Sequence, residues 1–413
     1  MGKQMIQLHG KTKSLRIDKP LTQLVWRLEL ADPNAGFDFS LFSNSNQTMQ
    51  PFGLIRSHSH IPDNNFDYIQ TPEELDYLKL NDIISLSYTA NRINVQWRGN
   101  TSTNSLLLTE RCDNYCLMCS QPPREENDDW LLQVASDVIS LMPGEAEVLG
   151  FTGGEPTIYG DDFIELVRHF SEKLPNTALH ILSNGRKFSD IKFAEKYAEV
   201  ANKSMMIGIP IYGAESQLHD YVVQAEGAFD QTINGILNLG EYGQSIEIRV
   251  VAHKQTAPAL VQIAEFISRN LPFVDQVAIM GLEMIGLARG NFQEVWIDPV
   301  EYKNQLAEAV NHLASNNIHV MVYNHQLCLT HTDIWKFAVK SISDWKNEYD
   351  PICEPCQVRE QCGGFFNSAK YGASSQIQAL KVDGSPLYNQ KESLANETKT
   401  RWRRKSIPHT SIS

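Results

Sequence analysis

The chain has 413 residues, of which 42% are hydrophobic and 21% are charged, and it carries a formal net charge of −13. This composition is ordinary for a globular protein of two or three domains. The acidic balance argues against a nucleic-acid partner, because neutralising phosphates requires a basic surface. No apolar run is long enough to span a membrane and the first residues contain no apolar leader, so we expect a cytoplasmic protein without membrane association.

Residues 1–100 predict a small β-rich domain. Four segments alternate polar with apolar or β-branched residues, a pattern typical of strands. They are Leu21–Leu30, Phe37–Phe42, Ile83–Tyr88 and Ile93–Trp97. His58 and His60 indicate a solvated loop rather than a metal site, since two histidines without further ligands rarely bind a metal. A free edge of this domain could receive a peptide as an added strand, which we treat as a hypothesis.

Three cysteines, Cys112, Cys116 and Cys119, follow a short apolar run with the spacing C-x3-C-x2-C. Thiolates crowded into one loop can ligate three irons of a [4Fe–4S] cluster and leave the fourth iron open to a small chelating molecule. Structural zinc is an alternative, but it requires four ligands, and neither Asp113 nor His180 obviously supplies the fourth. Disulfides are a second alternative, which a chain without a secretory leader gives no reason to expect.

The segment Phe151–Gly160, FTGGEPTIYG, is the next motif along the chain. A buried strand runs here into a glycine pair, Gly153 and Gly154, and then into the carboxylate of Glu155. Paired glycines allow a backbone to approach a ligand closely, and a carboxylate can bind an ammonium group. Alone, a glycine pair indicates only a tight turn. Its place after the three cysteines favours a ligand site.

From residue 103 onward, strand and helix patterns alternate. The apolar runs of strand length are Ser105–Leu108, Val148–Phe151, Ala178–Leu182, Met205–Ile211, Ile246–Val251 and Val274–Met280. The helical patterns between them are Trp130–Met142, Phe163–Leu174, Phe229–Tyr242 and Ala259–Asn270. Six such repeats predict an α/β protein with a parallel sheet and right-handed crossovers. One more helix, Val300–Ala314, and one strand, His319–Tyr323, follow them.

The remaining cysteines lie near the C-terminal end: Cys328, Cys353, Cys356 and Cys362. All seven cysteines of the chain therefore fall in two places, which indicates ligands rather than core residues, although cysteine is common in cores. The second group is interpreted either as a zinc knuckle or as a second iron–sulfur cluster. Residues 374–413 are polar and predict a flexible tail.

The cysteine loop followed by GGE resembles the radical S-adenosylmethionine (SAM) enzyme superfamily. The resemblance implies a partial (β/α)6, TIM-like barrel with the active site at the C-terminal ends of its strands. It also implies that the three loop cysteines hold a [4Fe–4S] cluster that binds SAM, and that Gly153, Gly154 and Glu155 bind the SAM amino group. The expected reaction is reductive cleavage of SAM to a 5′-deoxyadenosyl radical. Met118 stands where the family usually has an aromatic residue.

Two further strand ends are assigned to SAM by the same resemblance. Ser183 and Asn184 resemble the family's segment near the SAM ribose, with a plain Asn-Gly turn as the alternative. Arg249 could pair with the SAM carboxylate or form a structural ion pair, because an arginine within a strand is costly to bury alone.

Two residues are candidates for a catalytic role. Pro210–Gly213, at the end of the fourth strand, replaces the serine and aspartate common in relatives that modify peptides. Tyr212 in this segment could face the substrate, donate a hydrogen or simply pack. Glu283 is the second candidate, within Ile279–Asn291, which resembles the family's sixth-strand region along adenine.

The C-terminal spacing C-x2-C-x5-C resembles the auxiliary-cluster extension called SPASM or Twitch, found on radical SAM enzymes that modify ribosomal peptides and proteins. It implies one auxiliary [4Fe–4S] cluster on the four C-terminal cysteines. Phe366 stands where full SPASM domains have a further cysteine, so a second auxiliary cluster is not expected. The predicted units are a β-rich domain (1–100), a radical SAM barrel (101–297), an auxiliary-cluster domain (298–373) and a tail (374–413).

The combination of these features resembles the radical SAM maturases of His-Xaa-Ser peptide systems. It implies an oxidoreductase-type enzyme that modifies a ribosomally made precursor peptide, together with a second radical SAM maturase and a reductant such as flavodoxin or ferredoxin. One alternative is sulfatase-maturase-like oxidation of a Cys or Ser in a protein. The other is a non-catalytic iron–sulfur or zinc scaffold that presents a precursor to a partner maturase.

Overall fold

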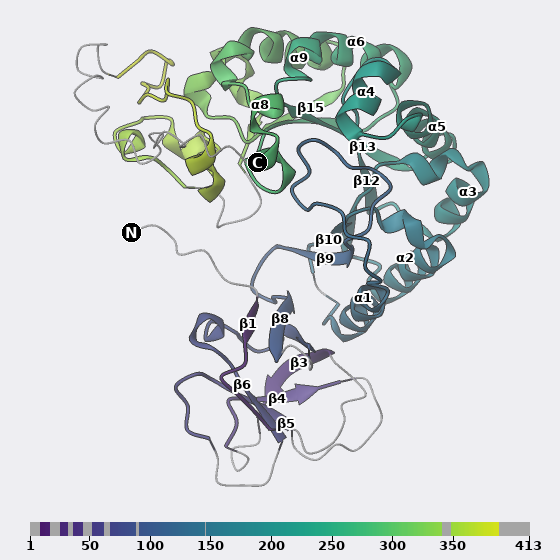
Figure 1. Ribbon diagram of the computed structural model, residues 1–413, viewed down its shortest axis with the longest axis vertical. Helices are drawn as coiled ribbons and strands as arrows, with labels where there is room; N and C mark the ends of the chain where they lie inside the picture. The colour runs from purple at the N-terminus through teal and green to yellow at the C-terminus, as the bar shows by residue number, and fades with distance from the viewer. Residues whose placement is uncertain are drawn as a thin grey trace, which may run out of the picture.

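The computed structural model describes residues 9–16, 25–31, 36–43, 52–61, 67–87, 91–144, 146–340 and 348–387. Two eight-stranded sheets organise this part of the chain, a curled N-terminal sheet and a parallel sheet accompanied by helices (Figure 1). A C-terminal extension of short turns follows them. Most of the predicted tail, residues 388–413, lies outside the described residues. None of the helices in these ranges has the length and apolarity that a bilayer span requires.

The N-terminal sheet confirms the predicted β-rich unit. Its order is β1-β8-β7-β3-β4-β5-β6-β2, and among its neighbouring pairs β5 and β6 run parallel while the others are antiparallel. Alternate residues enter one core, as the pleat of a strand requires. The strands are β1 (His9–Lys11), β2 (Ser14–Arg16), β3 (Val25–Leu30), β4 (Phe39–Phe42), β5 (Phe52–Ile55), β6 (Asp67–Gln70), β7 (Ile83–Ser87) and β8 (Arg92–Trp97).

The two edge strands of this sheet, β1 and β2, are separated in the chain only by Thr12 and Lys13. The sheet therefore curls until its edges meet. Thr12 N donates to Asn91 O and Lys13 N donates to Gln70 O, both over 2.9 Å. Because each edge strand has three residues, the described part of the sheet offers no long edge for an added peptide strand. The structure does not support that hypothesis.

The second sheet places its strands in chain order from β9 to β16, and every neighbouring pair is parallel. All six predicted strands are present. β15 and β16 extend the sheet beyond residue 297, so the boundary predicted there passes through the sheet. The strands are β9 (Thr103–Thr109), β10 (Val148–Gly153), β11 (Ala178–Leu182), β12 (Met205–Pro210), β13 (Ser245–Ala252), β14 (Gln276–Gly281), β15 (His319–Tyr323) and β16 (Ala338–Val339).

Helices connect the parallel strands and lie along the outer side of the curved sheet (Figure 1). The predicted helices are present as α1, α2, α5, α6 and α9. The sequence pattern does not predict α3 or α4, because helices of ten and eight residues give a weak periodicity. The bounds are α1 (Trp130–Leu141), α2 (Asp161–Lys173), α3 (Ile191–Val200), α4 (Ser216–Val223), α5 (Ala228–Glu241), α6 (Leu260–Asn270), α7 (Leu287–Gly290), α8 (Phe292–Val295) and α9 (Lys303–Ser315).

Alternation along the parallel strands separates an apolar outer face from a more polar inner face. Ile246, Ile248 and Val250 of β13 belong to the main hydrophobic core under the helices. Glu247 and Arg249, which lie between them in the chain, are on the opposite, inner face. The inner face leads to the C-terminal ends of the strands, where the sequence places its motifs.

The C-terminal extension packs against the barrel through aromatic residues. The Arg289 guanidinium lies 3.9 Å from the centre of the Tyr371 ring. At Gly372 a Cβ would lie only 3.0 Å from the Trp296 ring. Leu380 is buried, and Gln357 N donates to its carbonyl over 2.9 Å. This packing of residues 374–387 differs from the flexible tail expected from residue 374, because an apolar anchor holds the segment.

The N-terminal sheet also packs directly against the barrel. Val25, Ile83 and Trp97 belong to the same hydrophobic core as α1. Arg27 Nη1 donates to Leu141 O, at the end of α1, over 2.9 Å. The two units therefore share one core.

We expect Ile83→Ala to lower the free energy of unfolding by about 2–5 kcal/mol, because Ile83 is fully buried where the two units meet. Leu30→Ala is the control, since Leu30 is 81% exposed on the same sheet, and its effect should stay within about 0.5 kcal/mol. Urea unfolding of the metal-free protein, followed by circular dichroism, measures both. Two separate unfolding transitions, with stability lost in only one of them, would contradict the shared core.

Candidate active site

The cysteine loop, residues 110–129, connects β9 to α1 and carries Cys112, Cys116 and Cys119. The end of α4 supports its middle from one side. The N–H groups of Tyr115 and Leu117 donate to the carbonyls of Val223 and Val222, both over 2.9 Å. The loop therefore has main-chain partners that lie far along the chain.

The segment around α7 supports the cysteine loop from the other side. Leu287 N donates to Cys119 O over 2.9 Å, and Asn291 Nδ2 donates to Leu117 O over 2.8 Å. Gly286 has φ 54°, and a Cβ there would lie 2.3 Å from Cys119 O. Only glycine allows this approach, so the position of Cys119 depends on it.

Asp128 closes the base of the cysteine loop. Its carboxylate accepts hydrogen bonds from Thr109 Oγ1 over 2.9 Å, Glu110 N over 2.5 Å and Arg111 Nε over 2.9 Å. Burial alone would raise the pKa of Asp128, but these hydrogen bonds hold it below its ordinary value. The ionised carboxylate thus ties the end of β9 to the start of α1.

The glycine pair allows the end of β10 to touch the start of the cysteine loop. At Gly153, where φ is 145°, a Cβ would lie 2.2 Å from Thr109 O, and at Gly154 it would lie 2.0 Å from Arg111 O. Gly154 N and Glu155 N donate to these two carbonyls over 2.8 Å. The sequence explained the pair by approach to a ligand. In the structure the two glycines also allow the backbone of β10 to lie directly against the backbone of the cysteine loop. Both glycines line the cavity described below.

Glu155 is only 1% exposed, and its carboxylate accepts four hydrogen bonds. The donors are Thr157 N (3.0 Å), Thr157 Oγ1 (2.6 Å), Ser183 Oγ (2.8 Å) and Asn184 N (2.5 Å). Burial raises its pKa, and these bonds oppose the rise. Glu155 is not among the residues that line the cavity. Its contact with a SAM amino group stays a prediction, and its visible role is to join the ends of β10 and β11.

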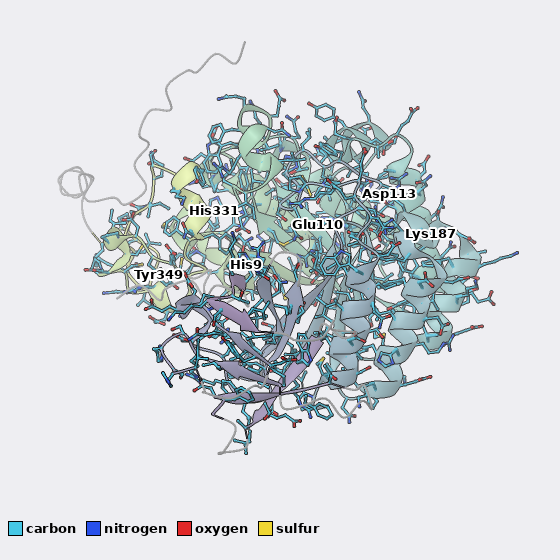
Figure 2. The ribbon with its side chains drawn as sticks, turned by 60° about the horizontal axis from the view of Figure 1, so that its bottom comes forward. His9, Glu110, Asp113, Lys187, His331 and Tyr349 are labelled. Atoms are coloured by element: carbon cyan, nitrogen blue, oxygen red, sulfur yellow. The ribbon has the colours of Figure 1, made fainter. Side chains whose placement is uncertain are left out.

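The turn after β11 docks onto the cysteine loop. Asn184 Nδ2 donates to Asp113 Oδ1 over 2.5 Å. Arg186 Nη1 donates to Asp113 O and to Asn114 Oδ1, both over 2.7 Å, and lies 3.2 Å from the Asp113 carboxylate. Asp113 is labelled in Figure 2, on the same side of the view as Lys187, which follows Arg186. The Ser183–Asn184 turn therefore positions the loop as well as bordering the cavity.

One cavity of about 420 Å³ joins these parts at the strand ends. Its volume lies within the range of about 300–1,000 Å³ common for small-molecule sites. All three loop cysteines line it. Its other predicted residues are Gly153, Gly154, Ser183, Asn184, Tyr212, Arg249 and Glu283. The structure therefore brings together every SAM-site residue named from the sequence except Glu155, which supports the others from behind.

The electrostatics of the three cysteines suit a metal cluster. Burial, with a smaller contribution from the nearby Glu155 and Asp113 carboxylates, raises the pKa of Cys112 to about 12. Burial also raises the pKa of Cys116 and Cys119. Thiolates in such surroundings require a positive counter-charge, which bound iron supplies.

A site for a single metal ion differs in its requirements from a site for a cluster. Across the described ranges, no three His, Cys, Asp or Glu side chains form a group that could hold one metal ion. Cysteines that bind different irons of a cluster do not have to converge on one centre, whereas zinc ligands do.

Arg249 and Tyr212 border the cavity in different ways. Arg249 Nη1 lies 2.5 Å from Glu247 Oε1, so the structural ion pair considered from the sequence is present, while the side chain still lines the cavity. Tyr212 is 8% exposed and packs in a hydrophobic cluster with Met118. Burial raises the pKa of Tyr212, so its phenol stays protonated.

The C-terminal extension gathers the other four cysteines: Cys328, Cys353, Cys356 and Cys362. Burial raises the pKa of Cys328, and the charges of the other three raise it further, which places the four thiols near one another. The hydroxyl of Tyr349, labelled in Figure 2, donates to Cys362 O over 2.8 Å. A small hydrophobic cluster packs around the group: Leu327, Val358 and Leu380.

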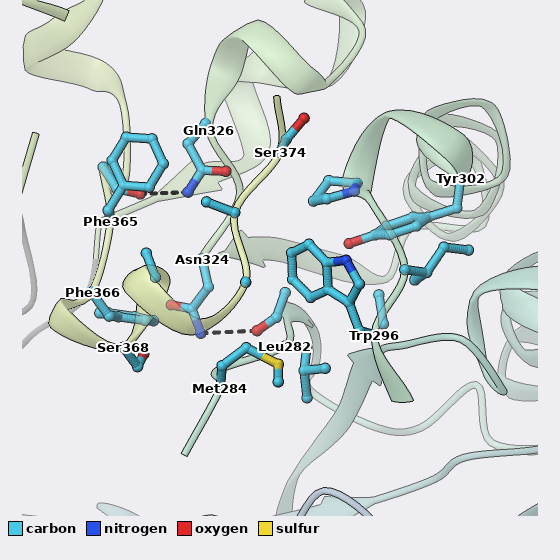
Figure 3. A pocket seen from close by; sticks show the side chains of 18 residues that line it. Leu282, Met284, Trp296, Tyr302, Asn324, Gln326, Phe365, Phe366, Ser368 and Ser374 are labelled. Carbon is cyan, nitrogen blue, oxygen red and sulfur yellow. Dashed lines mark hydrogen bonds between the residues drawn. The ribbon is translucent and has the colours of Figure 1, made fainter. Parts of the chain in front are cut away.

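A second cavity of about 50 Å³ adjoins the first on the side of the C-terminal extension (Figure 3). It shares three lining residues with the first: Gly281, Leu282 and Asn324. Asn324 Nδ2 donates to Gly281 O over 3.3 Å, and Gln326 Nε2 donates to Gly364 O over 2.7 Å. The rings of Trp296 and Phe365 form part of its wall. The two cavities together lead from the strand ends to the segment that follows Cys362.

A family model described as the Radical SAM superfamily matches residues 106–267. The matched range begins within β9, contains the cysteine loop and the glycine pair, and ends in α6. This segment is a radical SAM domain. The superfamily expected from the sequence is thereby confirmed for these residues, and the match contains the three loop cysteines and the glycine pair that line the strand-end cavity.

Comparison with curated proteins gives a partial match to this chain. A cysteine-type anaerobic sulfatase-maturating enzyme of Clostridium novyi (strain NT) is 26% identical over 149 residues. The match covers 34% of this chain and 38% of that enzyme, so the chain matches well under two thirds of this relative.

Solved structures resemble the radical SAM chain at low sequence identity. Streptococcus suis SuiB bound to S-adenosylmethionine has a TM-score of 0.43 and 15% identity, over 55% of this chain and 50% of that one. Native anSMEcpe with bound AdoMet has a TM-score of 0.46 and 14% identity, over 67% and 92%. Similarity at this level carries no argument about substrate, and these matches do not bear on the His-Xaa-Ser assignment.

Sequence reasoning missed several residues that support the cysteine loop and the strand-end cavity. Asp128 reads as an ordinary residue before a helix, and Asp113 and Arg186 are far apart in the chain, so their pairing is visible only in three dimensions. Glu247 could have been found. It stands two residues before Arg249, which places opposite charges on one face of a strand.

Gly154→Ala should prevent the cysteine loop from docking, because the added Cβ would lie 2.0 Å from the Arg111 carbonyl. We expect the reconstituted variant to lose about four irons per chain, the content of one cluster. Gly290→Ala is the matched control, since a Cβ there meets nothing within 4 Å. Iron analysis after anaerobic reconstitution measures both, and a normal iron content in Gly154→Ala would contradict this role of the glycine.

Proposed function

We propose that this protein is a radical SAM enzyme that modifies a residue of a ribosomally made peptide and uses one auxiliary [4Fe–4S] cluster. The observation that supports it most is the shared cavity. Three cysteines of one loop, the glycine pair and the Ser183–Asn184 turn border a single space of about 420 Å³ at the ends of parallel strands. Strand ends are where such folds bind their ligands.

In this proposal Cys112, Cys116 and Cys119 hold the first cluster. The main chain of Gly153–Gly154, the Ser183–Asn184 turn and the Arg249 guanidinium bind SAM. The cluster and SAM, held by these residues, would supply the chemistry for abstraction of a hydrogen atom from the substrate, with one electron from the reductant. The protein orients SAM through Arg249 and the turn, and the walls of the cavity exclude water from the reacting groups.

The four C-terminal cysteines hold the auxiliary cluster in the same proposal. Phe366, where a further cysteine of a full SPASM domain would stand, lines the second cavity. The substrate peptide then lies between the two cysteine groups, along the adjoining cavities. Glu283 lines the main cavity on this side and remains the candidate for contact with the peptide.

The finer proposal names a precursor of the His-Xaa-Ser type. Three features support it: the sequence of the cysteine loop, the PIYG segment at the end of β12 and the single C-terminal cysteine group. A second radical SAM maturase and a reductant such as flavodoxin or ferredoxin complete the proposed system.

The partial match to a sulfatase-maturating enzyme favours one alternative, oxidation of a Cys or Ser in a protein. Phe366 argues against this alternative. It stands where a full SPASM domain has a further cysteine, so the chain lacks a ligand that a second auxiliary cluster would need. The other alternative is a scaffold without catalysis, which the complete cysteine loop and glycine pair make less attractive.

Anaerobic reconstitution tests the proposal. Wild type should bind about eight irons, and variants in which either cysteine group is changed to Ala should each bind about four. With dithionite and SAM, only proteins that keep Cys112, Cys116 and Cys119 should form 5′-deoxyadenosine. Zinc in place of iron, or no 5′-deoxyadenosine from a fully loaded wild type, would leave the scaffold as the better interpretation.

A further inference from the structure

Three side chains with ionisable groups meet on the inner face of the barrel, beside the cavity. His180 of β11 and Glu247 and Arg249 of β13 form this group, which we call the inner-wall triad. Arg249 Nη1 lies 2.5 Å and His180 Nε2 lies 3.4 Å from the same atom, Glu247 Oε1. Gln276 Nε2 donates to the other oxygen, Oε2, over 2.5 Å.

The triad joins β11 to β13 across β12, which lies between them in the sheet. The residue of β12 at this point is Gly208, paired in register with Leu182 on one side and Glu247 on the other. A Cβ at Gly208 would lie 2.9 Å from Arg249 Cδ and 3.1 Å from His180 Nε2. Gly208 therefore leaves the gap through which the side chains of the two outer strands reach one another.

The carboxylate of Glu247 stays ionised although only 4% of its side chain is exposed. Burial would raise its pKa, but the nearby His180 imidazole and the charge of Arg249 lower it to about 2. A buried carboxylate that lost these partners would be strongly destabilised. The triad is thus a fixed arrangement, in which the position of each group depends on the others.

Arg249 is the member of the triad that borders the cavity. Its Nη1 is bound to Glu247, and its Nη2 donates to Met280 Sδ over 3.2 Å. A guanidinium has five N–H donors in a rigid plane, so fixing one edge determines where the others point. Glu247 is in this way placed to decide the direction of the remaining donors.

We propose that Glu247 is a positioning residue that orients the Arg249 guanidinium toward the carboxylate of the ligand in the cavity. His180 supports Glu247, and Gly208 has no side chain that would separate these groups. The inference rests on the SAM-binding role proposed above for Arg249. Glu247 does not touch the ligand and acts only through Arg249.

Steady-state formation of 5′-deoxyadenosine by the reconstituted holoenzyme, with dithionite and without peptide, tests this role. Glu247→Gln keeps the size of the side chain and removes its charge. We expect its KM for SAM to rise about tenfold while kcat stays within about twofold, because the change affects ligand binding and not chemistry. Equal KM values for the variant and wild type would overturn the proposal.

A double-mutant cycle separates positioning from general damage. In an Arg249→Ala background, Glu247→Gln should change the KM for SAM by less than about twofold, since the group through which it acts is gone. Multiplicative effects of the two substitutions would overturn the proposal. Iron content and circular dichroism confirm that each variant is folded and loaded.

Gly208→Ala tests the same contact without altering any charge. The added methyl group should separate His180 from Arg249 and raise the KM for SAM in the same direction as Glu247→Gln. Gly150→Ala is the matched control, because its Cβ would crowd Ser105 Oγ at 2.7 Å on the neighbouring strands β10 and β9. An equal rise in both glycine variants would assign the effect to crowding of the sheet and overturn the role of the triad.

Equilibrium binding of labelled SAM to the same proteins distinguishes the two levels of proposal. A wild type that binds SAM without cleaving it would contradict the proposed function, and the binding constants of the variants would still test Glu247. A wild type that cleaves SAM, with variants that bind SAM as tightly as it does, would contradict the inference alone.

Discussion

One buried carboxylate holds together the strand ends on which the site is built. Glu155 accepts two hydrogen bonds from Thr157 and one each from Ser183 and Asn184, and it thereby joins β10 to β11. The glycine pair that precedes Glu155 in the chain fixes β10 against the cysteine loop. Asn184, which donates to Glu155 from the turn after β11, also binds the cysteine loop through Asp113. Since an unsatisfied buried carboxylate is very costly, the three segments can be correctly placed only together.

The sequence predicted best what depends on local periodicity and spacing. The parallel strands and the longer helices follow from apolar patterns, and the cysteine loop with its glycine pair indicated the superfamily that the family comparison then confirmed. Both cysteine groups are brought together as expected, although their cluster ligation stays a prediction. These features succeed because each is encoded in a short stretch of chain.

The features that sequence reasoning missed depend on contacts between distant segments. The N-terminal sheet curls because β1 pairs with β8 and β2 pairs with β6. The residue pattern of a strand does not reveal which strand it pairs with. The hydrogen bonds that Glu155 accepts from Ser183 and Asn184, which follow β11, were not predicted, while its contact with a SAM amino group stays a prediction. The packing of Leu380 near the C-terminal cysteines was hidden within a polar segment.

The strand order of the parallel sheet has a consequence for biogenesis. Each strand from β10 to β16 pairs with the one made just before it, so the barrel can grow progressively as the chain leaves the ribosome. The cysteine loop emerges early, yet it is held by Val222, Val223, Leu287 and Asn291, which are synthesised much later. A nascent chain therefore exposes three reactive thiols before their enclosure exists. If the three cysteines hold the proposed cluster, their complete site exists only after the sixth strand of the barrel, β14, and the helix after it, α7, have been translated.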